Sequence, residues 1–192
     1  MLTRAVLEES FKVYFDEIER CVRGRCYWAL LHLVVVLPDI CASLESDNGE
    51  TNDSRYRNWR KRYLADQLIK PGDWYRMRCI VLHQGRTVDE EGKSQYAVFS
   101  FSQPNEAGLA VHPCVKEGKQ GKILHMDVGV MADLVRAAMH KWFEFLEKNE
   151  QPEKVQNVVR NAEMLARSQD RPVMPTAMQM FTIQNYTTSS PH

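Results

Sequence analysis

An arginine and a histidine five positions apart, Arg78 and His83, have the residue types that acid–base chemistry on RNA requires. The guanidinium is a permanent cation, and the imidazole gains and loses a proton near neutral pH. Four mostly apolar residues separate them, on a helix that the sequence predicts to end at Gly85. A fixed cation and a titrating base are the two groups that RNA cleavage without a metal ion needs.

The spacing of Arg78 and His83 leaves two interpretations open. Residues five apart differ by about 140° around an ideal helix, so we expect the two side chains to lie apart within one chain. Two copies around a two-fold axis would bring both pairs into one cleft, because such an interface sets a surface against itself. Alternatively, Arg78 pairs with Asp39 or Asp73, and His83 is merely a polar helix end. A buried Arg78 locked to Asp39 would exclude the catalytic interpretation.

The segment around the pair is basic, although the chain as a whole is neutral, with 25 Lys and Arg against 25 Asp and Glu. From Arg55 to Arg86 nine basic residues stand against two acidic ones, a local charge of +7. Aromatic residues alternate with these charges, as in surfaces that stack bases and hold phosphates. The side chains that we expect to contact RNA are Arg55, Arg57, Arg60, Lys61, Arg62, Arg76 and Arg86. The alternative is a solvated basic helix face with its aromatics turned to the core.

Four residues with metal-binding side chains lie in strand-like segments. His112 and Cys114, and His125 and Asp127, are each two positions apart, so each pair faces one side of a strand. The spacing is loose, and such residues are usually ordinary members of a sheet. We therefore expect neither a metal ion nor a cofactor.

The pattern of apolar residues predicts a mainly α-helical protein with a small β insertion. Helical spacing covers 3–22, 27–44, 55–68, 74–84, 127–148 and 153–167. Pro38 is expected to bend the second helix or to start a new segment. Asp53 or Ser54 should cap the third helix, and Asp73 the fourth. Alternating residues predict short strands at 95–101, 109–115 and 121–125.

Length and composition predict a single domain over residues 1–168, with its core at about 25–149 and its β insertion at about 95–125. Residues 169–192 are rich in Gln, Pro, Thr, Ser and Met, which is typical of a disordered or partner-dependent tail.

Cysteine usage and charge indicate the compartment. The five cysteines include no CxxC pair, and three lie in apolar helical segments. Such cysteines are typical of proteins in a reducing compartment. Acidic residues stand near the N-terminus, where an export signal would be basic. The apolar run from Ala29 to Pro38 is too short to span a bilayer comfortably. We expect a cytoplasmic protein that does not enter a membrane.

The run Arg78-Cys79-Ile80-Val81-Leu82-His83 resembles the R-x4-H motif of the HEPN superfamily, compact helical proteins that include many toxin and antiviral ribonucleases. The resemblance covers roughly residues 27–148. It comprises an apolar helix ending in Pro38-Asp39-Ile40-Cys41, a basic helix, the motif helix, a β insertion and a closing helix from about Asp127.

This resemblance implies a HEPN-like helical bundle that forms a homodimer and cuts RNA in a shared cleft without metal. Arg78 and His83 would be catalytic, and Asp39 and Cys79 would support them. The products would be a 2′,3′-cyclic phosphate and a 5′-OH. The resemblance also implies a role in toxin–antitoxin or antiviral defence, with an antitoxin or another defence protein as a further partner.

The chain differs from the family at two positions near the motif. Cys79 stands where a polar Asn, Asp or His is common, and Gly85 replaces a tyrosine found in one toxin subgroup. Regulation through that tyrosine is therefore not expected. Because the superfamily also has inactive members, a non-catalytic HEPN module for dimerisation or for nucleotide or RNA binding is the alternative. A third interpretation is a helical scaffold whose basic segment binds an acidic protein.

Overall fold

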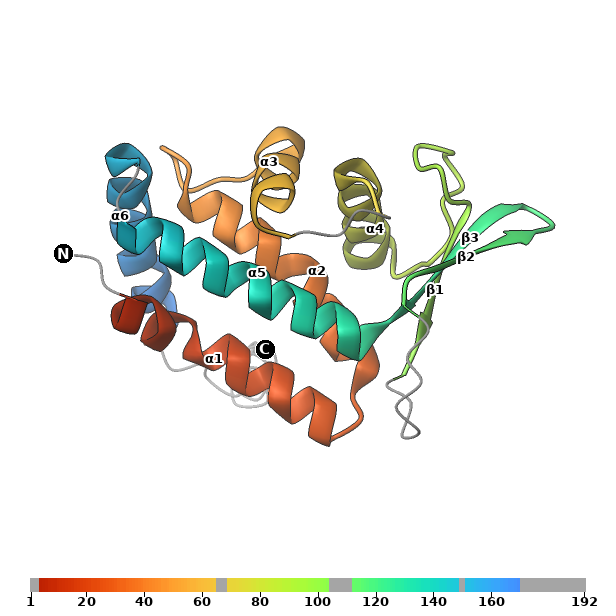
Figure 1. Ribbon diagram of the computed structural model, residues 1–192, viewed down its shortest axis with the longest axis horizontal. Coiled ribbons are helices and arrows are strands. Elements are labelled where there is room, and N and C mark those ends of the chain that lie inside the picture. Colours follow the sequence, from red (N-terminus) through yellow and green to blue (C-terminus); the bar gives the residue numbers. More distant parts are fainter. Residues whose placement is uncertain (1–3, 65–68, 104–111, 149–150, 170–192) are drawn as a thin grey trace, which may run out of the picture.

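The computed structural model describes residues 4–64, 69–103, 112–148 and 151–169, with side chains as far as residue 162 in the last of these segments. The described residues form six helices and three strands, which confirms the predicted class (Figure 1). In chain order they are α1 (Arg4–Arg23), α2 (Tyr27–Leu44), α3 (Asp53–Tyr63), α4 (Pro71–Gln84), β1 (Val98–Ser102), β2 (Cys114–Gly118), β3 (Gly121–Asp127), α5 (Val128–Lys148) and α6 (Pro152–Gln169).

Helices α2 and α5 pack against each other at the centre of the molecule (Figure 1). Helix α1 covers one side of this pair, while α3 and α4 lie side by side on the other. Apolar residues recur at helical spacing on the inner face of each, so the core is continuous from α1 to α4. Its largest buried side chains include Trp59, Trp74 and Trp142.

Helix α2 runs without interruption through Pro38, so the expected new segment does not occur. Its mean hydropathy of 1.7 over 18 residues makes it long and apolar enough to cross a membrane, by length and composition alone. The expectation of too short a run was therefore wrong. Yet 56% of the helix is buried against the rest of the protein, as in the core helix of a soluble protein.

The starts of α3 and α4 differ from the sequence prediction. The N-cap of α3 is Asn52, whose side chain accepts a hydrogen bond from the Arg55 N–H at 2.9 Å, rather than Asp53 or Ser54. Helix α4 begins three residues earlier than expected, at Pro71, because proline suits the first helical position. Its end at Gly85 is confirmed, where φ is 59°.

Asp73 lies inside the first turn of α4 and does not cap it. Its carboxylate is buried and accepts hydrogen bonds from the Ser94 hydroxyl at 2.6 Å and the Gln95 side-chain amide at 2.8 Å. Farther along α4, Arg76 forms an ion pair with the buried Asp89 at 2.6 Å. These contacts fasten α4 to the segment that leads into β1.

The three strands form a mixed sheet in the order β1-β3-β2, with β1 parallel and β2 antiparallel to β3. The insertion predicted at about 95–125 is confirmed by this sheet, which lies at the end of the molecule opposite α6 (Figure 1). Part of the predicted strand 109–115 lies outside the described residues.

Helix α6 is attached to the C-terminal end of α2. The Asn161 side chain donates to the carbonyls of Leu44 and Ser46 at 3.0 and 2.8 Å, and Asn157 donates to that of Glu45 at 3.1 Å. Carbonyls at a helix end need such donors when they are buried. These bonds hold α6 against α2, whereas the predicted tail beyond Gln169 lies outside the described residues.

Candidate functional site

Arg78 and His83 contact each other within one chain. Nη1 of Arg78 lies 3.0 Å from Nε2 of His83. The expectation that helix geometry keeps the two apart was wrong, because the Cα positions differ by about 7.5 Å along the axis and a long arginine side chain can bridge that distance. One copy of the chain therefore already holds both groups together.

The other amino group of Arg78 binds Asp39. Nη2 of Arg78 donates to Oδ2 of Asp39, which projects from α2. Only 16% of the Arg78 side chain and 9% of the Asp39 side chain are exposed. Burial alone would lower the pKa of Arg78, but the Asp39 carboxylate outweighs it, so the net pKa lies above its usual value. Arg78 is thus a fixed cation with a fixed direction.

The resulting chain of contacts runs from a buried carboxylate to an exposed imidazole. His83 lies in the last turn of α4 and is exposed, and Gly85 ends the helix just beyond it. Guanidinium N–H groups only donate, so Nε2 of His83 accepts and the ring proton lies on Nδ1. A lone pair held at a defined place is what a general base needs. Arg78 is paired with Asp39, as in the structural interpretation, but it is only partly buried and its contact with His83 is exposed, as in the catalytic one.

Two further α4 side chains flank Arg78. Its Nη1 lies 3.9 Å from Sγ of Cys79, and its guanidinium carbon lies 5.9 Å from the ring centroid of Tyr75. Tyr75 and Arg78 are three apart, so they share one helix face. Tyr75 also receives the Arg57 guanidinium of α3, at 5.9 Å. Sequence reasoning placed Tyr75 only among the aromatics of the basic segment, although its spacing from Arg78 could have singled it out.

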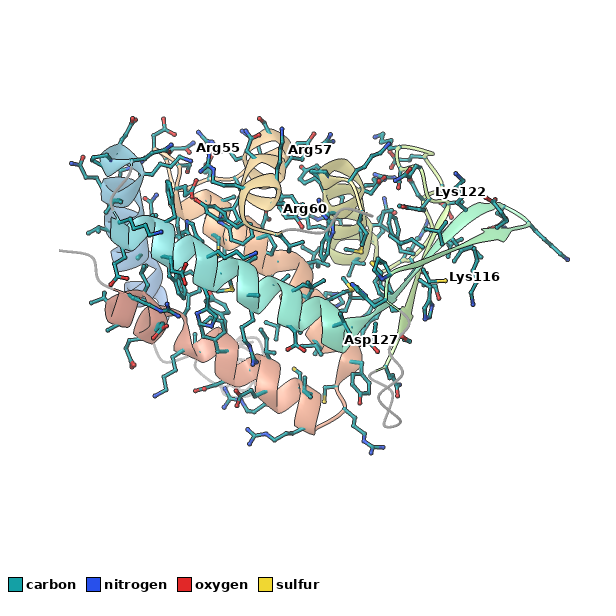
Figure 2. All side chains as sticks on the ribbon, viewed as in Figure 1. Arg55, Arg57, Arg60, Lys116, Lys122 and Asp127 are labelled. Carbon is teal, nitrogen blue, oxygen red and sulfur yellow. The ribbon has the colours of Figure 1, made fainter. Side chains whose placement is uncertain are left out.

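The seven side chains predicted to bind RNA do not form one surface. Arg60 is only 3% exposed and lies 5.6 Å from the Trp74 ring, on the inner side of α3 (Figure 2). Arg76, with 12% of its side chain exposed, is held by Asp89. Both have packing or pairing roles that remove them from a nucleic-acid surface.

Arg55 and Arg62 lie toward a pocket of about 660 Å³ between α2, α3 and α6. Arg55 donates to Asn48 and Asp47, and Arg62 lies near the Glu45 carboxylate and over Phe145. Of the seven, Arg57, Lys61, Arg62 and Arg86 are exposed, and all of these except Arg62 lie away from the pocket; Figure 2 shows Arg57 on the outer side of α3. Arg57 is the one in contact with the ring beside Arg78.

The 660 Å³ pocket has its charges already matched. Glu45 at its wall accepts from Tyr63 Oη at 3.0 Å, Trp142 Nε1 at 2.9 Å and Lys154 Nζ at 2.8 Å. Because its cations face this carboxylate or Asp47, the pocket offers no surplus positive charge to an anionic ligand. Neither Glu45 nor its partners stood out in the sequence, since they are far apart along the chain.

A second hollow, of about 450 Å³, is apolar and lies next to the motif. Its lining comes from α1, α2 and the end of α4 and comprises Glu17, Cys21, Ala29, His32, Leu33, Val36 and Leu82. Leu82 directly precedes His83. The outer face of α2 is therefore apolar up to the edge of the candidate site.

Three of the four possible metal ligands have other contacts. His125 bonds to the Ser100 hydroxyl at 3.1 Å, His112 accepts from the Asp127 N–H at 3.2 Å, and the Asp127 carboxylate accepts from the Val130 N–H at 3.0 Å. Among the described residues no group of three or more His, Cys, Asp or Glu side chains is arranged to hold a metal ion. All five cysteines are free thiols.

Comparison with protein-family models, with curated proteins and with solved structures gives no significant match.

Proposed function

We propose that the protein is a HEPN-type ribonuclease that cuts RNA without a metal ion. The observation that carries the proposal is the contact between Arg78 Nη1 and His83 Nε2, 3.0 Å apart at the exposed end of α4. A cation directed by a buried carboxylate and an exposed imidazole whose Nε2 lone pair faces that cation are the groups that the reaction uses.

The reaction follows from the direction of these groups. A ribose 2′-OH that enters beside His83 gives its proton to Nε2, and the 2′ oxygen attacks the neighbouring phosphorus. Arg78 turns its Nη1 from His83 to the phosphate oxygens, while Nη2 stays on Asp39. The bond from phosphorus to the 5′ oxygen breaks as that oxygen takes a proton from the imidazolium of the partner's His83. The products are a 2′,3′-cyclic phosphate and a 5′-OH.

A homodimer is part of the proposal, and the apolar hollow beside the motif supports it. The α2 side chains that line the hollow are mostly apolar, so a second copy would remove them from water. A second copy seated on α2 across a two-fold axis would meet the same face and bring a second Arg78 and His83 close to the first pair. Changing Val36 in the hollow to Glu should shift the protein toward monomer in analytical ultracentrifugation. Val13→Glu, at an exposed apolar position of α1 outside the hollow, is the control.

RNA cleavage tests the proposed activity directly. Wild type, Arg78→Ala and His83→Ala are incubated with RNA in EDTA, with circular dichroism to verify folding. The wild type should cut and both variants should lose at least about a hundredfold in rate, as when a general base or a charge-stabilising donor is removed. Equal cleavage by all three proteins would refute the assignment. Because the proposed role is in toxin or antiviral defence, expression of the wild type should also slow growth more than expression of His83→Ala.

The second candidate is a non-catalytic HEPN module that dimerises or binds nucleotides or RNA. The Arg78–Asp39 ion pair and the thiol of Cys79 beside it favour this alternative, because an arginine held by a carboxylate needs no substrate. This module would bind RNA with no product formed, and binding would be unchanged by His83→Ala. An antitoxin or another defence protein would then be its functional partner.

A further inference from the structure

The Tyr75 ring joins Arg57 of α3 to the Arg78–His83 pair of α4. Both guanidinium carbons lie 5.9 Å from the ring centroid, so they are no farther apart than twice that distance. The ring is half-buried and is backed by the buried Tyr56 at 5.4 Å, in an edge-on arrangement. Arg57 on α3 and Tyr75, Arg78 and His83 on α4 therefore form one row of contacting side chains.

Two like charges this close repel each other, and the electron-rich ring offsets only part of that repulsion. Arg78 has its own carboxylate, Asp39. Arg57 has Asp53 four residues before it, but about half of each side chain is exposed. Exposed pairs of this kind contribute little to stability, so an incoming phosphate can replace the Asp53 carboxylate at little cost.

The helix opposite Arg57 leaves room for its guanidinium. A Cβ atom on Gly72 of α4 would lie 3.0 Å from Nη1 of Arg57, which is closer than side chains normally approach. An alanine there would push away the end of a flexible side chain without changing any charge. Gly72 therefore helps to define where the Arg57 cation lies.

We propose that Arg57 binds the phosphate adjacent to the one on which Arg78 and His83 act, with Tyr75 setting the spacing of the two cations. The substrate is then an RNA strand with at least two consecutive phosphates in the site, and a dinucleotide uses only half of it. This inference rests on the proposed function and assigns a positioning role to Tyr75 and Gly72.

Binding tests the inference without requiring cleavage. The probe is a fluorescent RNA oligonucleotide whose 2′-OH groups are methylated, titrated with wild type, Arg57→Gln and Gly72→Ala over a range of salt concentrations. Arg20→Gln is the matched control, since Arg20 is also an exposed arginine in an ion pair within one helix, on α1. Arg57→Gln should weaken binding about tenfold and reduce the slope of log K against log salt by about 0.7, the value for one phosphate of a single strand.

Gly72→Ala should weaken binding in the same direction with the slope partly retained, while Arg20→Gln should match the wild type. Equal affinities and slopes for Arg57→Gln and Arg20→Gln would overturn the inference, as would a wild type that does not bind the oligonucleotide. Tyr75→Phe should bind like the wild type because the ring is kept, and Tyr75→Ala should bind like Arg57→Gln.

Cleavage of short substrates separates this inference from the proposed activity. On a trinucleotide with two phosphates, Arg57→Gln should lose about tenfold in kcat/KM, and on a dinucleotide with one phosphate the loss should be several-fold smaller. A uniform loss on both would contradict a second phosphate site while leaving the activity intact. Binding that depends on Arg57, with neither substrate cut by the wild type, would contradict the activity and leave the phosphate site intact.

Discussion

Two carboxylates near the C-terminal end of α2 have opposite surroundings. Glu45, at the helix end, is surrounded by donors from α3, α5 and α6, among them Trp142 Nε1 and Lys154 Nζ. Asp39, inside the helix, has Arg78 as its partner, and its Oδ1 has no hydrogen-bond partner among the described residues. The contacts of Glu45 end within the protein, whereas those of Asp39 continue through Arg78 to an exposed histidine.

The difference separates a carboxylate that stabilises the fold from one that directs a site. A buried charge with all its partners inside the protein holds elements together, and removing it leaves those partners unpaired. A buried charge whose partner reaches the surface fixes the direction of that partner. We therefore expect changes at Glu45 to affect mainly stability, and changes at Asp39 to affect mainly activity.

The largest loss of stability is expected at Glu45. Glu45→Ala removes the acceptor of Trp142 Nε1 and Tyr63 Oη and the partner of Lys154, and should lower the free energy of unfolding by about 3 kcal/mol. Urea unfolding measures it. Glu153→Ala, an exposed change in the same pocket, should stay within about 0.5 kcal/mol of the wild type. Similar losses for the two variants would remove the distinction drawn for Glu45.

Asp39→Asn should act in the opposite way. Arg78 keeps some solvent contact, so the loss of stability should be about 1.5 kcal/mol, as for one hydrogen bond to a charged group. Cleavage should fall about a hundredfold, because a misdirected guanidinium no longer meets the phosphate. Rates are compared under conditions where both proteins are fully folded. A variant that is strongly destabilised yet cuts at the wild-type rate would reverse the comparison.

Asp89 is a buried carboxylate whose partners, like those of Glu45, lie within the protein, and its contribution to stability depends on pH. Burial alone would raise the pKa of Asp89, but hydrogen bonds from Arg76 and from the Ser94 N–H outweigh it, so the pKa is lowered. Its contribution to stability is thus complete above the unfolded value of about 3.9 and is lost as the pH falls through the lower folded value.

Asp89→Asn should therefore cost about 2 kcal/mol at pH 7, and the difference from wild type should shrink toward pH 2. Urea unfolding at several pH values measures it. Asp47→Asn, in an exposed pair with Arg55, should show almost no such change. A difference at Asp89 that stays constant with pH would contradict the assigned role.

The smallest effect is expected at Tyr56, beside the Asp39 end. Its hydroxyl is buried without a hydrogen-bond partner among the described residues, and burial raises its pKa well above the ordinary range. Tyr56→Phe should therefore change stability by less than about 0.5 kcal/mol and leave cleavage unchanged. A loss above about 1 kcal/mol in thermal unfolding would mean that this hydroxyl supports the site.

The helices were predictable because their apolar residues repeat at helical spacing, and Gly85 marked the end of α4 correctly. The starts of the helices were not predictable in the same way. Asn52, Asp53 and Ser54 are all good capping residues, and which of them caps α3 depends on the path of the preceding loop. The partners of Asp73 lie more than 20 residues ahead of it, so its neighbours gave no signal.

The site was predictable in its residue types but not in its geometry. The motif named Arg78 and His83, and Asp39 was one of two expected partners for the arginine. The angle between two positions on an ideal helix describes Cα directions, so it missed the reach of the arginine side chain. The basic segment also overstated the exposed positive surface, because Arg60 and Arg76 are used for packing and pairing.

Identification of the RNA ends tests the central claim most directly. A defined RNA is incubated in EDTA with wild type or His83→Ala, and the ends of the fragments are identified by mass spectrometry. Catalysis by Arg78 and His83 predicts 2′,3′-cyclic phosphates and 5′-OH groups from the wild type, and no fragments from His83→Ala. Fragments with 5′-phosphates, or cyclic phosphates formed equally by His83→Ala, would contradict it.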